Sequence, residues 1–425
     1  MNFFDKNIIS EPSSTWKKIL FLILVLFMGK GCNYFIEIDP RVNIIGTLLL
    51  LVPLFWVIAK EKKYKIEGNK IFAVIAVYLI WYSYHLFADI ESPLYQGLKF
   101  LSLLFFAYVT VKHYSYHIAE YFEHIVVRLT LLALVLWFVE IVIGPATMGA
   151  MAPFDNYMHI YSKSFGLYSV ITIFDAQTAF LGLPRNCGFC WEPGQFASLI
   201  VLALTFNLLR RNDRILNSKN FLILVLGLIS TFSTTGFVTF AVLIFLKTIF
   251  AKVSVLQRIA YSVLLIVVFL TAMDLPFMRE KIERHADVDL FFSNSSNVFI
   301  GEAGHRTVER FEGMYLSWLN LQEKPWLGFG PNNGNSLTAR EYPMLVISNG
   351  NIYPIAMLGI LIGVSFFFLL YKGTRRLSGF LGNENKYILF LVIMMFSVSY
   401  NYMYDIIMIA IAFLSFNRHD EQRYA

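Results

Sequence analysis

Residues 301–334 read GEAGHRTVERFEGMYLSWLNLQEKPWLGFGPNNG and belong to the one long polar segment of the chain, 275–346. Charged side chains gather in the first half of the quoted stretch, and a run rich in Gly, Pro and Asn follows. On both sides of 275–346 the chain is almost entirely apolar. The sequence therefore predicts membrane spans that hold a large polar loop against one face of a bilayer.

The composition supports this reading. Of the 425 residues, 57% are hydrophobic and 15% are charged, whereas soluble domains carry about 25% charged residues. Apolar runs of roughly 17–25 residues recur, which is long enough to cross a hydrocarbon core of about 30 Å. We expect an all-α polytopic membrane protein with about twelve transmembrane helices, some of them short or broken.

Basic residues set the orientation. The run KEKKYK at 60–65 is the strongest cytoplasmic signal, because cytoplasmic loops are enriched in Lys and Arg. The other basic loops are expected on the same side, with both termini: Lys112, His113, His117 and Arg128; Arg210, Arg211 and Arg214; Lys372, Arg375 and Arg376. The net charge of +6 is therefore no sign of a nucleic-acid partner.

Two apolar runs have basic flanks at both ends and a polar middle. The first, 219–247, contains STFSTTG at 230–236, and the second, 386–416, contains SYNYMYD at 399–405. We expect each to form two short half-spans with a polar break, which protein or water must satisfy.

The chain divides into three parts. Residues 1–274 are expected to hold transmembrane helices 1–9, with an aromatic periplasmic segment at 146–191 that lies along the interface. Residues 275–346 form the large periplasmic loop, and 347–425 hold the C-terminal transmembrane helices.

Two candidate residues precede one span. Arg185 is suited to a diphosphate, because guanidinium donates two parallel hydrogen bonds and keeps its charge, but it is equally suited to anchoring lipid headgroups. Glu192, followed by Pro193, is first of all a helix N-terminus signal. It is also a candidate base for an attacking hydroxyl.

Cys187 and Cys190 form a lone CxxC. Without a second pair they predict no zinc site. An external disulfide and two buried thiols both remain open.

The polar loop holds the remaining candidates. Arg306 and Arg310 are four residues apart and would share a face on a helix, where Glu302, Glu309 and Glu312 could neutralise them. His305 is a candidate base near neutral pH. The turn-rich passage that starts at Trp326 either wraps a sugar chain or only links two segments of the chain.

Nucleotide-dependent chemistry is not expected. The sequence has no Walker motif and no dinucleotide glycine pattern, and Asp287-Val-Asp289 has the DxD spelling only on the outer side. No cofactor and no metal ion are expected.

Two sets of motifs resemble the O-antigen polymerase and ligase superfamily of bacterial envelopes. They are Arg185-x-x-Gly188-x-x-x-Glu192-Pro193-Gly194 with the later Ser-Thr-Thr-Gly, and Arg310, Lys324-Pro325-Trp-Leu-Gly328-Phe-Gly330, Ser348-Asn349 and Gly359-Ile-Leu-Ile-Gly363. The resemblance covers roughly 185–363. Ligases typically carry His-Asn where this chain has Ser348-Asn349, so the resemblance is closer to the Wzy-type polymerases.

This resemblance implies a GT-C-like glycosyltransferase in the bacterial inner membrane, with its site on the periplasmic side. The enzyme would transfer a growing glycan from undecaprenyl diphosphate onto a lipid-linked repeat unit. The resemblance also implies a separate partner protein that regulates chain length. Glu192, His305 and Arg310 are the predicted catalytic residues, and Arg185, Arg306 and Asn349 the predicted substrate ligands. The alternatives are a ligase that acts on lipid A core, and a transporter or flippase.

Overall fold

The structure is a computed structural model. It describes residues 15–29, 67–88, 94–155, 162–171, 182–210, 218–249, 306–307, 310–341, 345–346, 350–382, 385–401 and 405–417, with single helical positions at 256, 259 and 263. Within these residues, four helical stretches are long and apolar enough to cross a membrane: Gly68–Phe87, Gly97–Ile143, Pro193–Arg210 and Ile352–Phe380. The predicted class, a membrane protein built of α-helices, is therefore confirmed at this coarse level.

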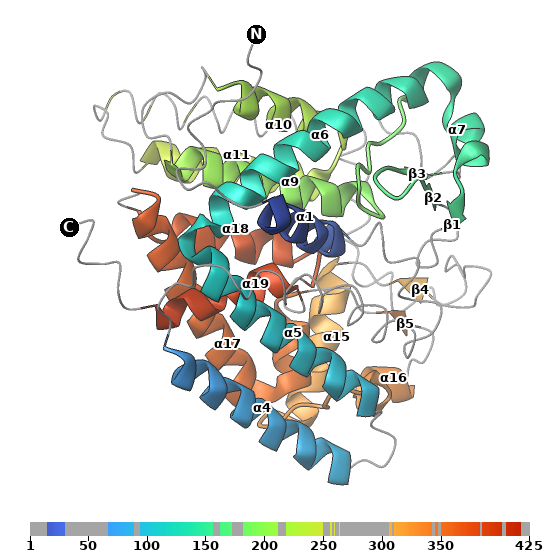
Figure 1. Cartoon of the computed structure of the whole chain (residues 1–425). Helices are drawn as coiled ribbons and strands as arrows, with labels where there is room; N and C mark the ends of the chain where they lie inside the picture. Colours follow the sequence, from blue (N-terminus) through green and yellow to red (C-terminus); the bar gives the residue numbers. More distant parts are fainter. Residues whose placement is uncertain are drawn as a thin grey trace.

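The helices of the bundle are α1 (Thr15–Gly29), α4 (Gly68–Ala88), α5 (Leu94–Tyr114), α6 (Ile118–Ile143), α9 (Pro193–Arg210), α10 (Lys219–Ser230), α11 (Thr234–Ile249), α17 (Ile352–Phe380), α18 (Ile388–Ser397) and α19 (Ile406–Phe413). A single 3₁₀ turn, Ser115–His117, separates α5 from α6, and Figure 1 shows the chain reversing there. Another 3₁₀ turn, Leu414–Phe416, ends α19.

Shorter elements lie between the long helices. Among them are α7 (Pro145–Met151), α15 (Arg310–Glu323), a 3₁₀ turn (Asn333–Asn335) and α16 (Leu337–Glu341). Strands β1 (Phe154–Asp155), β2 (Ser162–Ser164) and β3 (Ser169–Ile171) form an antiparallel sheet, and β4 (Arg306–Thr307) pairs in parallel with β5 (Leu345–Val346). Both sheets lie on the right-hand side of Figure 1.

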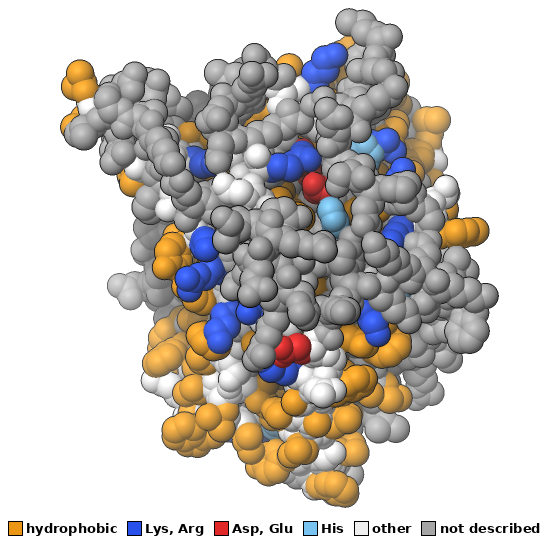
Figure 2. All heavy atoms as spheres, turned by 60° about the vertical axis from the view of Figure 1, so that its left-hand side comes forward, with side chains coloured by type: hydrophobic (Ala, Val, Ile, Leu, Met, Phe, Trp, Pro, Cys, Tyr) orange, Lys and Arg blue, Asp and Glu red, His pale blue; other side chains and the backbone are white. Residues whose placement is uncertain are grey.

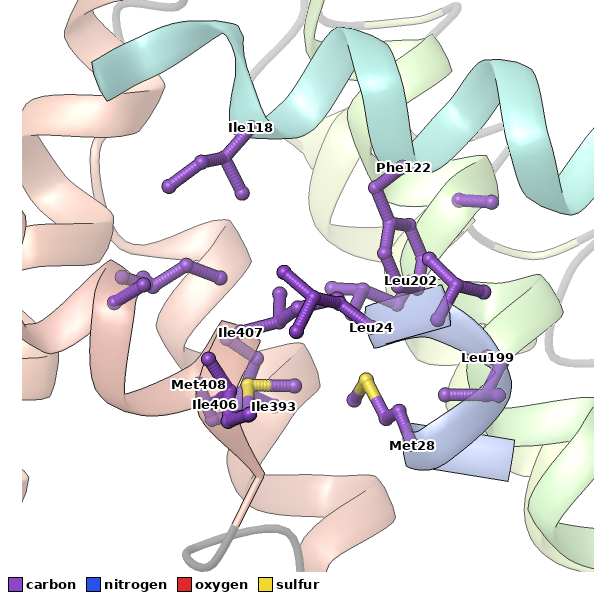
Figure 3. Close-up of a cluster of buried hydrophobic side chains, with 14 of the residues drawn as sticks. Leu24, Met28, Ile118, Phe122, Leu199, Leu202, Ile393, Ile406, Ile407 and Met408 are labelled. Atoms are coloured by element: carbon purple, nitrogen blue, oxygen red, sulfur yellow. The ribbon is translucent and has the colours of Figure 1, made fainter. Parts of the chain in front are cut away.

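Helix α1 packs one face against the apolar core. Leu24 and Met28 of α1 point toward Leu199 and Leu202 of α9 and toward Ile407 near the start of α19 (Figure 3). Helix α9 is buried along nearly its whole length. A helix that is buried on all sides is expected at the centre of a bundle. Helix α9 therefore fixes the positions of the loop before Pro193 and of Arg210 at its other end.

One end of the bundle, here called the basic end, brings several predicted cytoplasmic loops together. The Tyr114 hydroxyl donates to the Lys17 carbonyl (2.7 Å), and Asn417 Nδ2 donates to Ser115 Oγ (3.0 Å). Arg376 Nη1 donates to the carbonyls of residues 414, 415 and 417. Helix ends far apart in the sequence therefore meet on one side, as the positive-inside pattern predicts.

Figure 2 brings this side forward and shows Lys and Arg side chains across its middle and upper part, with hydrophobic side chains along its lower part. One prediction needs correction: several basic residues that were expected in loops lie on helices, because Lys and Arg are good helix formers and the helices extend beyond the apolar runs. Lys112 and His113 belong to α5, Arg128 to α6, and Lys372, Arg375 and Arg376 to α17.

Both apolar runs with polar middles form pairs of short helices, as predicted. Helices α10, α11, α18 and α19 contain 12, 16, 10 and 8 residues, or about 18, 24, 15 and 12 Å of helix. Each is shorter than a hydrocarbon core of about 30 Å. The backbone between the paired helices must therefore find its hydrogen-bond partners inside the protein.

Helix α17 is kinked at Gly359, and the turn passage 324–330 fills the kink. The N–H groups of Phe329 and Gly330 donate to the carbonyls of residues 356 and 357 (both 3.1 Å), and Ile360 N donates to the Pro325 carbonyl (2.8 Å). Trp81 Nε1 also donates to the Leu327 carbonyl (2.8 Å). This passage is thus a structural wedge that links two helices: Gly328, Phe329 and Gly330 are buried against α17, whereas Trp326 is exposed.

The kink predicts a specific sensitivity. Gly359 has φ +77° and ψ 166°, a conformation open almost only to glycine, and an added Cβ would lie 2.1 Å from the Trp326 carbonyl oxygen. We expect Gly359→Ala to lower the melting temperature of the purified protein, with about 1–3 kcal/mol from the backbone alone and a further loss from the clash.

Gly382→Ala is the matched control, because Gly382 has φ +76° but no atom within 4 Å of an added Cβ. Backbone strain alone costs about 1–2 kcal/mol. Equal melting temperatures for the two variants would show that the wedge does not fill the kink.

Candidate functional site

Four chain segments meet at the end of α9 opposite the basic end, and we name them the polar junction: 184–195, 230–236, 350–351 and 397–401. Thr235 Oγ1 lies 2.9 Å from Ser399 Oγ, and Gly350 N donates to the Ser397 carbonyl (2.6 Å). The Tyr400 hydroxyl packs against Gly194, 2.2 Å from where a Cβ would be. Both broken helix pairs therefore share one polar centre.

Arg185 lies in this junction and is half-buried. Its Nε and Nη2 donate to the carbonyls of Thr231 and Phe232 (3.4 Å each), the residues at the break that follows α10. A guanidinium at the carbonyl end of a helix is stabilising, because that end carries partial negative charge. Within the part of the chain that the structure describes, these contacts use two of its five N–H groups. Arg185 therefore has a structural role and also has donors that these contacts do not use.

Asn186 fixes the loop that carries Arg185. Its backbone N–H donates to the Ser230 carbonyl (3.0 Å), and Nδ2 donates to Ser230 Oγ (2.9 Å). Its Oδ1 accepts from the N–H of Gly188 (2.9 Å). The side chain is fully buried, so these bonds are strong constraints on the position of Arg185. Sequence reasoning missed this residue, since an asparagine in a Cys/Gly-rich loop resembles any turn residue.

Three helix N-termini point into the junction: those of α9, α11 and α17. Residues 194, 235 and 350–351 supply the contacts described above, and each lies within two residues of the start of its helix. Helix N-termini present unpaired N–H groups and partial positive charge, which favour anions. The junction therefore combines these three positive dipole ends and the Arg185 guanidinium with the carbonyl ends of α10 and α18, whose partial negative charge is partly taken up by Arg185 and by the Gly350 N–H.

Glu192 directly precedes α9 and is half-buried. Its position is that of an ordinary acidic residue at a helix start, as expected. It also lies near enough to the Cys187 thiol to act on that group electrostatically, as Arg185 does. Arg185 and Glu192 are thus brought together around the same short loop, which the sequence spacing alone did not establish.

A buried carboxylate supports the loop from the side of α6. The Tyr168 hydroxyl donates to Glu140 Oε2 (2.5 Å), and Trp137 Nε1 donates to the Pro184 carbonyl (2.7 Å). Ser169 N, next to Tyr168, donates to the Gly188 carbonyl (2.8 Å). Burial, and after it the Glu140 carboxylate, raise the pKa of Tyr168 well above its usual value. Sequence reasoning overlooked Glu140, although an acid within an apolar span is itself a signal.

Both cysteines of the CxxC are buried free thiols, so the disulfide alternative is not observed. Burial, and then the Glu140 carboxylate, raise the pKa of Cys187 well above its usual value, while Arg185 acts in the opposite direction. Among the residues that the structure describes, no three His, Cys, Asp or Glu side chains gather as metal ligands.

The candidates in the large loop are only partly described. Arg306 belongs to β4 and Arg310 is the first residue of α15, so the expected shared helix face does not form: a strand ends between them. His305 and Asn349 lie outside the described residues, as do Glu302 and Glu309. Their proposed roles stay predictions.

The thiols give a direct test of the loop. In a Cys32→Ser variant, we expect maleimide to modify the folded protein very slowly at pH 7, because the thiolate is the reactive form and a raised pKa keeps Cys187 protonated. Because burial raises the pKa of Cys187 well above the usual thiol value of about 8.5, labelling should stay slow even at that pH. Intact-mass analysis would count the adducts.

Denaturation is the control, since it should expose two reactive thiols at once. Fast labelling of the folded protein at pH 7 would contradict the buried loop. Adducts that form only after reduction would reveal a disulfide.

No family model matches this sequence, and no curated protein matches it. The features that bear on function are those of the chain: a half-buried arginine, a carboxylate at the end of the same loop, and helix N-termini directed at one polar centre.

Proposed function

We propose that the chain is a membrane glycosyltransferase of the polymerase type. It transfers a growing glycan from undecaprenyl diphosphate onto a lipid-linked repeat unit at the periplasmic face of the bacterial inner membrane. The observation that supports this most is the polar junction, where Arg185 and three helix N-termini meet at the end of the bundle opposite the basic end.

The chemistry of the donor matches this arrangement. A lipid diphosphate is acidic enough to leave unprotonated, so the reaction needs cationic density on the diphosphate and no general acid. Arg185 and the helix ends supply positive potential in a partly buried setting, where electrostatic stabilisation is stronger than in water. Arg310 and Arg306 are proposed to complete the binding of the diphosphate from the large loop.

The acceptor hydroxyl must lose a proton, and Glu192 is the proposed base. Glu192 directly precedes α9, and both Glu192 and Arg185 are near enough to Cys187 to act on it electrostatically, so one bound sugar-diphosphate could meet both side chains. His305 is the second candidate for this role, and Asn349 a proposed glycan ligand.

The depth of the junction suits a lipid carrier. Helices α9, α10 and α18 extend about 27, 18 and 15 Å, respectively. If α10 and α18 start at the basic surface, the breaks after Ser230 and Ser397 lie within a hydrocarbon layer of about 30 Å. A diphosphate on a polyprenyl tail would reach such a site from the lipid.

One observation also favours a transporter of lipid-linked glycan. Paired discontinuous helices are typical of transporter binding sites near the bilayer midplane. Uptake or flipping of the lipid-linked repeat in proteoliposomes, without elongation, would favour this second function. A ligase would instead leave polymer on the carrier lipid when its gene is deleted.

The polymerase proposal predicts the behaviour of Arg310→Ala. With purified protein and lipid-linked repeat units, we expect elongation to fall by about 10²–10³, the usual effect of losing one fixed donor to a developing negative charge. Products are sized on a gel. Arg340→Ala is the matched control, because Arg340 lies in the same loop and is paired with Glu323 at the surface. Unchanged elongation by Arg310→Ala would remove Arg310 from the site.

A second variant tests the base. Glu192→Gln keeps the size and polarity of the side chain but removes its proton-accepting charge, so we expect the elongation rate to fall by about 10²–10⁴. Glu120→Gln is its control, since Glu120 lies at the basic end and contacts His117 (2.8 Å). A Glu192→Gln enzyme with the normal rate and pH profile would exclude this base.

A further inference from the structure

A cluster of basic side chains lies at the basic end, far from the polar junction. It consists of Lys18 on α1, His124 and Arg128 on α6, and Arg210 at the end of α9. His124 and Arg128 are four residues apart and share a helix face. Lys18, Arg128 and Arg210 are all near enough to His124 to act on it electrostatically.

Packing between the helices explains why the cluster forms. The Phe21 ring of α1 contacts the Tyr121 ring (centroids 5.5 Å apart), and the Phe122 ring contacts the Phe206 ring of α9 (5.7 Å). The turn of α6 at 121–124 is therefore held between α1 and α9, and the basic side chains of all three helices are drawn to one place.

Arg210 has a structural role in this cluster. Its Nη2 donates to Glu123 Oε2 (2.7 Å), and Asn207 Nδ2 donates to Glu123 Oε1 (2.7 Å), with Glu123 only 1% exposed. The Glu123–Arg210 pair joins α6 to the end of α9. Lys18 and Arg128 are exposed side chains on the same side of the molecule.

The surface next to Arg128 is apolar. Leu131, Leu132 and Val135 follow it on the same side of α6 and are 39%, 37% and 56% exposed. On α1, Trp16 near Lys18 is 50% exposed. The surface thus changes from cationic to apolar along one helix face, and a molecule with an anionic head and hydrocarbon chains is complementary to it.

We propose that Lys18 and Arg128, with His124 beside them, bind the phosphodiester of an anionic phospholipid from the leaflet at the basic end. Arg128 can donate two hydrogen bonds to phosphate oxygens, and Lys18 supplies a point charge. The acyl chains lie along Leu131, Leu132 and Val135. This site is separate from the proposed glycan site and does not depend on it.

The test uses the full-length protein in neutral detergent with phosphatidylglycerol or phosphatidylcholine added, and native mass spectrometry counts bound lipid. We expect phosphatidylglycerol to be retained preferentially. The double variant Lys18→Gln/Arg128→Gln should bind it about 30-fold more weakly, since each basic residue near a membrane surface contributes about 1 kcal/mol and tenfold is 1.4 kcal/mol.

Arg375→Gln/Lys386→Gln is the matched control, because it also removes two exposed charges at the basic end: Lys386 lies 3.7 Å from the Cβ position of Gly379, near the end of α17. Retention close to wild type in this control supports a defined site. Equal losses in both double variants, or equal binding of the two lipids, would overturn it. Full competition by inorganic phosphate at the lipid concentration would also overturn the proposal, by showing a free-anion site.

A second measurement uses the wild-type protein, so it tests the site even if the double variant does not fold. A photoreactive phosphatidylglycerol is crosslinked to the wild-type protein, and the labelled peptides are mapped. Labels within 16–22 and 124–135 support the site. Labels restricted to α17 and α18 would contradict it.

Discussion

The structure depends on one constraint: backbone groups that leave a helix inside an apolar bundle must be paired by the protein. Three positions show how this is done. Arg185 binds carbonyls at the break after α10, Asn186 binds Ser230, and the 324–330 wedge binds the groups freed at Gly359. In each of these three cases, a loop from elsewhere in the chain enters the bundle and pairs the freed backbone groups. Each of these helix breaks is therefore also a point of long-range contact.

This constraint links the fold to the candidate site. Polar side chains are drawn to the breaks because freed N–H and C=O groups are costly to leave unpaired. A polar centre therefore forms where the two helix pairs meet, with helix N-termini around it. The helix N-termini and the Arg185 guanidinium that stabilise the breaks carry positive charge, and positive charge also attracts anions. Arg185 can therefore have both a structural and a chemical role.

The two ends of the bundle differ in what they hold. At the basic end, Arg376 and Arg210 are tied to backbone carbonyls and to Glu123, and they fix helix ends in place. At the opposite end, Arg185 combines such contacts with nearby Glu192 and a buried support from Glu140 and Tyr168. The proposed lipid site and the proposed glycan site therefore lie at opposite ends of α9 and can be tested separately.

The sequence alone determined the class of the protein, the short helix pairs and the gathering of basic loops at one end. These features follow from apolar length, from polar residues within apolar runs and from charge bias, all of which are local in the sequence. Arg185 and Glu192 could be chosen because they stand just before an apolar helix. The sequence did not determine that Arg306 and Arg310 occupy different elements, because strand pairing with Leu345–Val346 depends on a distant segment. Only the tertiary structure revealed Asn186, Glu140 and the wedge as supports, since their partners lie tens of residues away and no local pattern encodes such contacts.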